Sequence, residues 1–478
     1  MALAYASPDA IRQWQPYLER EGFTGQLEGL NLLDPAQIVA WGGLFLPDPS
    51  IGRWAQWRNP VGPAAFSLIG QIHTLSTPAA LAHLQDLVTE PVEPWDAVIC
   101  SSTAGRAVAL AIVQDREEQL LLRSGGSRAP LAAHRPQLPV IPLPLPVSQL
   151  VASLPTRAGA RQALGLAPQD HVVLWLGRLS ALTKADPYPL YAVLQRVAPR
   201  LDQPLVLIEC GPDDTAPQAQ EFERLRRLCP AVQFVRLGGQ EPVDETVKAH
   251  ALAAADLACS LVDNAQETFG LAVAEAMAAG LPVVASDWDG YRDLVRDGVD
   301  GFLVPSRWAA SATQLSVALG WQQFTGLQSF PAIAGALAQL VQLDLPKAEA
   351  AMLALLSDPA LAVAMGRAGQ QRAISCFDTD QVMHHYESLF AELAELRAAA
   401  PAAERQPRPS PLHLDPVRTF GDFASHPPLP LAEASPQSLA GLPEPLLQGR
   451  APLWQLLLQS ASEPVASQLR ADLLRKHQ

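Results

Sequence analysis

Long apolar runs are missing from this sequence of 478 residues. A membrane-spanning helix needs about 18 or more consecutive apolar residues, and we find no such run. The start, Met1-Ala-Leu-Ala-Tyr-Ala, has neither the basic region nor the long apolar core of a secretory signal peptide. We therefore expect a cytoplasmic protein, an expectation that still permits peripheral contact with the inner face of a membrane.

Positive charge is also scarce. The formal net charge is −14 and the sequence pI is about 5.2, so no broad basic face is available to neutralise a nucleic-acid backbone. We therefore expect no nucleic-acid partner, although a local basic pocket is compatible with this charge.

Paired cysteines are absent as well. The five cysteines are odd in number, scattered, and never in a C-x-x-C pair. Most of them stand in apolar runs, so we expect small buried hydrophobic side chains rather than a zinc site or a disulfide framework. They are Cys100, Cys210, Cys229, Cys259 and Cys376.

The chain does contain a regular alternation of strand and helix patterns. With 49% hydrophobic and 17% charged residues, its composition is that of a globular protein with two or three domains. The alternation predicts parallel strands joined by crossover helices. Strands are expected at 26–33, 44–46, 65–73, 96–100, 172–177, 205–208, 233–235, 255–260, 283–285 and 301–304, the last being the final strand.

These elements fall into two series. Four prolines within residues 139–146 rule out a central strand and predict a linker between domains. We predict an α/β fold of two Rossmann-like, doubly wound domains that face a cleft, at 1–139 and 140–400. Residues 401–478, rich in Pro, Ala and Leu, are expected to form an extended tail with one helix near 454–474.

The stretch 264–286 carries the most local information. Thr268 is a good helix N-cap, residues 272–279 are rich in alanine, and Gly280 can adopt the left-handed conformation that ends a helix. Pro282 blocks continuation of the helix, and a buried strand follows. The stretch therefore predicts a loop, a short helix and a strand.

Two glutamates bracket this helix start. Glu267 and Glu275 should lie about 10 Å apart, whereas the carboxylates of glycosidases stand about 5 to 9.5 Å apart. The amides of Phe269, Gly270 and Leu271 lie between them as an anion site, and Gly270 would let a phosphate approach the backbone. The pattern fits an elongated nucleotide sugar or an amphipathic surface helix with two solvated glutamates, and the spacing alone does not decide between them.

A basic loop follows the strand at 172–177. The segment Gly177-Arg178-Leu-Ser-Ala-Leu-Thr-Lys184 places two cations at the carboxyl edge of a parallel sheet, where sites form in α/β proteins. Arg178 and Lys184 could hold a diphosphate and stabilise it as it leaves. A solvated loop with incidental basic residues is the alternative.

Taken together, these segments resemble the family 4 retaining glycosyltransferases. The resemblance rests on Gly177-Arg178-Leu179 with Lys184, on Glu267-Thr-Phe-Gly-Leu through Glu275 to Ser286, and on Asp297-Gly to Pro305. It covers about 141–386 and implies the GT-B fold, in which the second domain holds most of the nucleotide sugar. No resident cofactor is implied, because the nucleotide sugar is a substrate.

The resemblance also implies roles for the residues. Arg178 and Lys184, next to Gly177, would bind the diphosphate, and Glu267 would bind hydroxyls of the donor sugar. Glu275 would bind the ribose. The donor site would be completed by the backbone amides of Phe269, Gly270 and Leu271.

The first half resembles the family more weakly. Family members often place a histidine at a strand end facing the donor sugar, and His73 is our candidate, with a structural role as the alternative. Ser101 or Ser102 is expected to cap a helix. No glycine-rich turn precedes Ser7, which leaves open whether this domain has its usual first strand.

Two Asp-x-Asp pairs invite a metal interpretation. Hard oxygen ligands suit Mg²⁺ or Mn²⁺, but Asp289-Gly290 makes a good turn after Asp287-Trp288, and Asp378-Thr-Asp380 begins a helix. We predict no metal.

We therefore expect a retaining, metal-independent hexosyltransferase that serves polysaccharide or glycolipid synthesis, with catalytic roles for Glu267, His73, Arg178 and Lys184. Its partners would be a nucleotide-sugar donor and a carbohydrate or lipid-linked acceptor. A non-catalytic nucleotide-sugar-binding or scaffold protein is the alternative, and a sugar-nucleotide epimerase is less favoured.

Overall fold

The computed structural model describes residues 2–5, 9–20, 22–25, 27–31, 34–408 and 420–425. The chain divides into two compact units, Met1–Ala40 with Pro409–Gln478, and Trp41–Arg408. The tail helix expected near 454–474 lies outside the described residues.

The first unit contains a small parallel sheet. Strand β1 (Ala2–Tyr5) pairs in parallel with β2 (Glu28–Asn31), and helix α1 (Asp9–Arg20) connects them. Helix α2 (Ala36–Val39) follows. A strand therefore does precede Ser7, where the sequence had left its presence open.

The second unit begins with a three-stranded parallel sheet. Its order is β3 (Gly43–Phe45), β4 (Ser67–Gln71), β5 (Ala97–Ile99). All five residues of β4 are buried, as expected of a central strand. The connecting helices are α3 (Ile51–Arg58), α4 (Pro78–Thr89), α5 (Thr103–Ser124) and α6 (Arg128–Ala133). The predicted strands in this region are confirmed.

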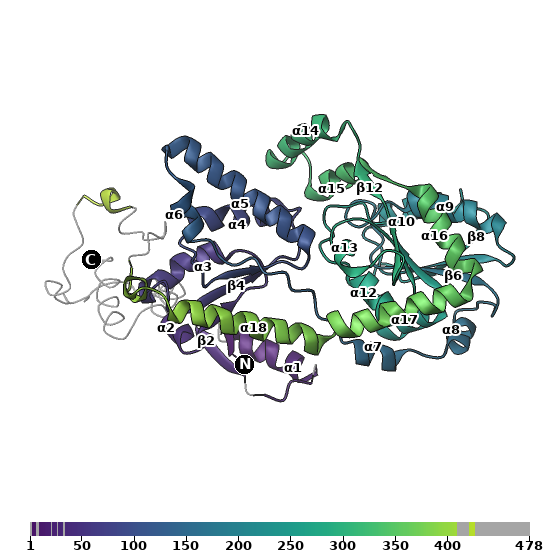
Figure 1. Cartoon of the computed structure of the whole chain (residues 1–478), viewed down its shortest axis with the longest axis horizontal. Coiled ribbons are helices and arrows are strands. Elements are labelled where there is room, and N and C mark those ends of the chain that lie inside the picture. Colours follow the sequence, from purple (N-terminus) through teal and green to yellow (C-terminus); the bar gives the residue numbers. More distant parts are fainter. Residues whose placement is uncertain are drawn as a thin grey trace, which may run out of the picture. The chain divides into compact units, whose positions relative to one another are not determined.

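A six-stranded parallel sheet forms the core of the following domain (Figure 1). Its order is β11 (Gly301–Val304), β10 (Val283–Ser286), β9 (Leu257–Ser260), β6 (His171–Leu176), β7 (Leu205–Cys210), β8 (Val232–Leu237). From β6 the chain first builds outward on one side and then returns to place β9 on the other. The loops after β6 and β9 therefore separate at a topological switch point, where ligands bind in open α/β sheets.

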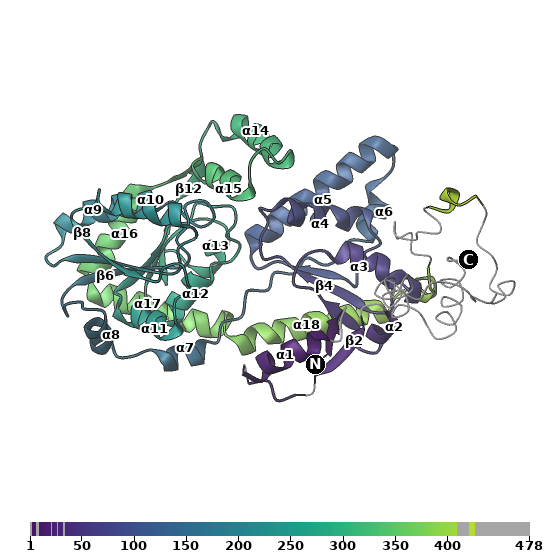
Figure 2. The ribbon, with the colours of Figure 1, turned by 180° about the vertical axis from the view of Figure 1, so that it is seen from behind.

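Helices cover both faces of this sheet, as the two opposite views show (Figure 1, Figure 2). One layer contains α7 (Val147–Ser153), α8 (Arg157–Ala163), α11 (Glu245–Ala254), α12 (Leu271–Ala278) and α17 (Pro359–Cys376). The other contains α9 (Pro187–Val197), α10 (Ala216–Arg226) and α16 (Leu345–Ser357). Short α13 (Tyr291–Leu294) follows β10. The doubly wound α/β fold is thus confirmed.

An insertion follows β11. Strands β12 (Ser306–Trp308) and β13 (Val341–Leu343) pair in antiparallel register and enclose helices α14 (Ala312–Phe324) and α15 (Phe330–Ala338). The prediction that 301–304 is the last strand is therefore wrong. Strands of three residues give too little alternation to be seen in the sequence.

Helix α18 (Thr379–Ala398), capped by Asp378, runs back along the three-stranded sheet (Figure 1). Its Tyr386, Leu389 and Leu393 join a buried cluster with Ile69 and Ile99. Among the described residues no single helix is long and apolar enough to cross a membrane. Only α16 and α17 together reach that length and apolarity, and they meet at 105°.

Candidate functional site

A cavity of about 220 Å³ lies at the switch point of the six-stranded sheet. All of the predicted site residues except Glu275 line it. They are His73, Gly177, Arg178, Lys184, Glu267, Phe269, Gly270 and Leu271. The fold thus brings together residues that are far apart in the sequence, such as Lys184 and Glu267, which are separated by 83 positions.

The floor of the cavity depends on close contact between two strand ends. Gly177, which follows β6, donates its amide to the Cys210 carbonyl at 2.9 Å. A Cβ on Gly211 would stand 1.9 Å from the carbonyl oxygen of Gly177, so only glycine fits at this position. This contact fixes the backbone from which the Arg178 loop departs.

The two cations of this loop each have a carboxylate partner. Lys184 Nζ lies 3.2 Å from Glu267 Oε2, and Arg178 donates to Asp214 Oδ1 at 3.3 Å. Ser180 Oγ also donates to Asp214, at 2.7 Å. The sequence analysis missed Asp214, which neutralises Arg178 while leaving about a third of its side chain (36%) exposed. The cations are therefore positioned and remain within reach of an anion.

The helix start beside these cations is open to a ligand. Gly270, with φ 106°, is the N-cap of α12, and no side chain among the described residues caps this end. The predicted cap at Thr268 is therefore wrong, because its hydroxyl donates instead to the His73 carbonyl at 3.1 Å. The first amides of α12 consequently point toward the cavity with the positive end of the helix dipole.

Gly270 also makes room for a tyrosine that the sequence analysis missed. A Cβ at Gly270 would stand 2.3 Å from Cε1 of Tyr291, so the ring packs directly on this backbone. The Tyr291 hydroxyl lies 2.7 Å from Ser260 Oγ, and burial raises the pKa of Tyr291. Tyr291 thus packs against the backbone of the donor loop at Gly270. Its position just after the Asp289-Gly290 turn was the sequence signal that could have identified it as a residue of the site.

Hydrogen bonds from hydroxyl groups connect the cavity wall at His73 to the donor loop. Besides the bond from Thr268 to the His73 carbonyl, Ser101 Oγ donates to the Thr268 carbonyl at 3.1 Å. Ser102 caps α5, as expected for one of these two serines. His73 itself is exposed and stands at the cavity's edge.

Glu275 lies apart from this cavity lining. Its Oε1 is 2.9 Å from Lys248 Nζ, which also lies 2.7 Å from Glu245. Burial alone would lower the pKa of Lys248, but the two glutamates outweigh it and the pKa is raised. Nothing in the sequence pattern pointed to Lys248. A ribose would have to share Glu275 with this ammonium group.

The Asp-x-Asp pair after β10 has other partners in the structure. Asp287 accepts from Arg292 Nε at 2.8 Å, and Asp289 accepts from Ser102 at 3.3 Å. Partial burial, together with the negative charge of Glu267, raises the pKa of Asp289 to about 7. Asp289 has φ 44°, the one positive φ among described residues other than glycine. Such backbone conformations are concentrated at functional sites.

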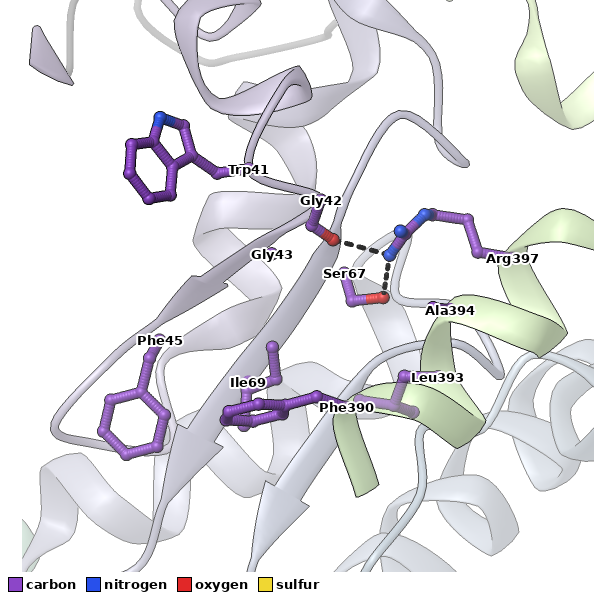
Figure 3. A pocket seen from close by; sticks show the side chains of 10 residues that line it. All are labelled: Trp41, Gly42, Gly43, Phe45, Ser67, Ile69, Phe390, Leu393, Ala394 and Arg397. Carbon is purple, nitrogen blue, oxygen red and sulfur yellow. Dashed lines mark hydrogen bonds between the residues drawn. The ribbon is translucent and has the colours of Figure 1, made fainter. Parts of the chain in front are cut away.

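A separate cavity of about 260 Å³ lies between the three-stranded sheet and α18 (Figure 3). Its wall is mostly apolar, with Phe45, Ile69 and Phe390 pointing into it. Its one charged group, Arg397, is held by the Gly42 carbonyl and by Ser67 Oγ, at 2.5 and 2.7 Å. With this cation already bound, the cavity lacks reactive groups and we assign no chemistry to it.

Comparison with known proteins adds the family context. The pattern described as "Glycosyl transferases group 1" matches residues 170–319. Phosphatidyl-myo-inositol mannosyltransferase of Mycobacterium leprae is 46% identical over 88 residues, which are 18% of this chain and 23% of that protein. D-inositol 3-phosphate glycosyltransferase of Mycobacterium marinum is 27% identical over 322 residues, 65% of this chain and 66% of that one. The matched parts thus span about a quarter and about two thirds of these relatives.

A solved structure is similar over most of the chain. Anabaena HepE in complex with UDP superposes with a TM-score of 0.50 at 17% identity, covering 82% of this chain and 92% of that one. At this identity the likeness concerns the fold. The chain therefore has the GT-B fold, and its residues 170–319 are a domain of the glycosyl transferases group 1 family.

Proposed function

We propose that this chain transfers a sugar from a nucleotide-diphosphate sugar to a carbohydrate or lipid-linked acceptor, with retention at the anomeric carbon and without a metal. The observation that carries the proposal is the switch-point cavity, where Arg178 and Lys184 meet the uncapped start of α12. Two cations and a helix dipole around one small space suit a diphosphate.

Each group has a distinct part in this proposal. The diphosphate lies between the guanidinium of Arg178 and the ammonium of Lys184, with the amides that begin α12 as further donors. Lys184 exchanges its bond to Glu267 for one to phosphate, and the released carboxylate accepts hydrogen bonds from sugar hydroxyls. Because these donors are oriented before the reaction, they stabilise the charge that develops on the leaving diphosphate.

The transfer itself needs no further co-reactant. The bond from the anomeric carbon to the diphosphate oxygen breaks, and the acceptor oxygen bonds to the same face of that carbon. The acceptor's hydroxyl proton passes to the leaving phosphate oxygen. His73, at the edge of the cavity, faces the sugar from the other domain.

The names of the similar proteins suggest which substrates to test first. The mycobacterial relatives are named for phosphatidyl-myo-inositol and D-inositol 3-phosphate, and the Anabaena structure contains UDP. These names support a uridine diphosphate sugar as donor and an inositol-type polyol as acceptor. Glycolipid synthesis would fit both this donor and this acceptor.

Calorimetry with a panel of UDP- and GDP-sugars, followed by transfer assays with the best binder, tests the proposal. We expect binding and transfer, both lost in the Arg178→Ala and Lys184→Ala proteins. Binding without transfer would support a non-catalytic nucleotide-sugar-binding protein instead. Full transfer by both variants would show that the donor site lies elsewhere. A change in the donor's own sugar without any acceptor would indicate an epimerase.

A further inference from the structure

A larger cavity, of about 440 Å³, lies beside the switch-point cavity. Leu75 and Val108 form one wall, from the domain of the three-stranded sheet. Trp288 and Asp289 form the opposite wall, and Trp308, from β12 of the insertion, completes it. Apolar walls with a few polar groups are typical of small-molecule sites. The donor roles proposed above make no use of this space.

The backbone places this cavity directly against the donor loop. A Cβ on Gly290 would stand 2.5 Å from Cα of Phe269 and 2.6 Å from the Thr268 carbonyl oxygen. The turn that presents Asp289 therefore lies on the segment that presents Glu267. Burial, with a smaller contribution from the negative charge of Glu267, raises the pKa of Asp289. A molecule in the larger cavity is thus next to the sugar end of the donor.

Two tryptophans shape the wall opposite the first domain. Trp288 Nε1 donates to the Asn264 carbonyl at 3.0 Å, which fixes its ring. Trp308 meets it edge to face at a centroid distance of 5.4 Å and is 47% exposed. Ser306 Oγ donates to the Asp287 carbonyl at 2.6 Å and ties β12 to the same loop. Trp308 is therefore an anchored aromatic surface that remains accessible.

The insertion also reaches the other wall. Gln323 Nε2, on α14, donates to the Ser76 carbonyl at 3.4 Å, and Ser76 lines the cavity. The insertion thus contributes Trp308 at one end and approaches the first domain near its middle. The insertion therefore lines the cavity through Ser306, Arg307 and Trp308 and also contacts the opposite domain at Ser76.

The polar groups narrow the chemistry of the ligand. Asp287 and Arg292 neutralise each other across 2.8 Å, and the exposed Arg307 adds a cation to the lining. Asp289 accepts a hydrogen bond from Ser102 through Oδ1, and its side chain is part of the cavity lining. A sugar or cyclitol ring offers an apolar face of C–H groups and a rim of hydroxyls. The face matches a tryptophan, and the hydroxyls match a carboxyl group that accepts hydrogen bonds.

We propose that this cavity is the acceptor site and that it binds a polyhydroxylated ring, stacked on Trp308 and hydrogen-bonded to Asp289. One hydroxyl of the ring then faces the donor sugar at Glu267. This inference rests on the sugar transfer proposed above. It adds that the acceptor is selected by the turn after β10 and by the insertion.

The first measurement is the binding of ring probes, independent of transfer. Binding of myo-inositol and of methyl α-D-mannopyranoside to the full chain is measured by ligand-observed NMR, with and without UDP. We expect binding by the native protein and a loss of at least tenfold in Trp308→Ala. Trp321→Ala is the matched control, because Trp321 is 61% exposed on the same insertion but does not line the cavity.

The second measurement separates acceptor from donor effects. Asp289→Asn keeps the size of the side chain, and asparagine tolerates a positive φ. We expect the KM for acceptor to rise at least tenfold in Asp289→Asn and Trp308→Ala, while the affinity for the donor nucleotide is unchanged. If neither variant alters ring binding or acceptor KM, the acceptor site is not here. If the native protein binds the rings but transfers no sugar, only the proposed transfer fails.

Discussion

Lys184 Nζ lies 3.2 Å from Glu267 Oε2, and both groups line the switch-point cavity. The pair joins the loop after β6 to the loop before α12, and it leaves Lys184 about one-third exposed (35%). The Glu267 side chain is only 12% exposed, so the pair is partly buried and holds the ammonium group in place. Its value is therefore to position an ammonium group that a diphosphate can take over.

Lys184→Ala should lower the transfer rate by about 10²-fold, as loss of one preorganised donor does in other enzymes. The diphosphate loses a cation, and Glu267 loses its partner, so donor affinity should fall as well. Steady-state kinetics with varied donor concentration measures both effects. Lys347→Ala is the control, because Lys347 is an exposed lysine on α16 outside the cavity. Equal activity of the two variants would contradict the assignment.

Local sequence sufficed to predict much of the donor cavity. Gly177, Arg178 and Lys184 stand within one short loop, and the segment from Glu267 to Leu271 is contiguous. Each segment follows a strand whose apolar run is easy to identify, so the parallel topology brings the two loops together. Predicting that these two loops lie side by side therefore required only the order of the strands.

Partners distant in sequence were not predictable in the same way. Lys248 reaches Glu275 from another helix, and Asp214 reaches Arg178 from beyond the next strand. The insertion escaped notice because residues 308–343 contain no Asp, Glu, Lys, Arg or His. Without charged positions, the alternation between buried and exposed faces that marks a helix or strand is weak.

Glu275→Gln should weaken nucleotide binding about tenfold if Glu275 holds the ribose, since a hydrogen bond to a charged group contributes about 1.5–3 kcal/mol. It also frees Lys248 from one of its two carboxylates. Calorimetry with UDP measures the change. Glu245→Gln is a matched control, because Glu245 shares the same lysine but stands on α11 and is largely exposed. If both variants lose affinity equally, the effect belongs to Lys248 and Glu275 has no direct role.

Gly270→Ala should destabilise the protein and impair donor binding together. The new Cβ would meet the ring of Tyr291 at 2.3 Å, and φ 106° is itself unfavourable for alanine. Thermal unfolding and nucleotide titration measure the two effects. Gly298→Ala is the control, because Gly298 has φ 74° but no neighbour within 4 Å of the new Cβ. It should lower the free energy of unfolding by about 1 kcal/mol and leave donor binding unchanged. Identical results for both variants would show that contact with Tyr291 is unimportant.

Asp263 supplies a prediction about pH. This carboxyl group is only 4% exposed and accepts one long bond, 3.4 Å from the Asp186 amide. Burial raises its pKa from 3.8 to about 7. Between these values the unfolded chain has released the proton that the native protein still holds. The free energy of unfolding should therefore fall as pH rises from about 4 to 7, with each pKa unit equivalent to about 1.4 kcal/mol at most.

Asp263→Asn removes this titration while keeping the size of the side chain. Asparagine stays neutral at every pH, so the variant should be more stable than the native protein at pH 8, and the difference should shrink toward pH 5. Denaturant unfolding at both pH values measures it. Asp297→Asn, in the loop before β11, is the control because that side chain is exposed. Asp289 also has a pKa raised to about 7, so it still contributes to the change of the free energy of unfolding with pH. Asp263→Asn should therefore weaken this pH dependence without abolishing it. A slope identical to that of the native protein would show that Asp263 is already ionised in the fold.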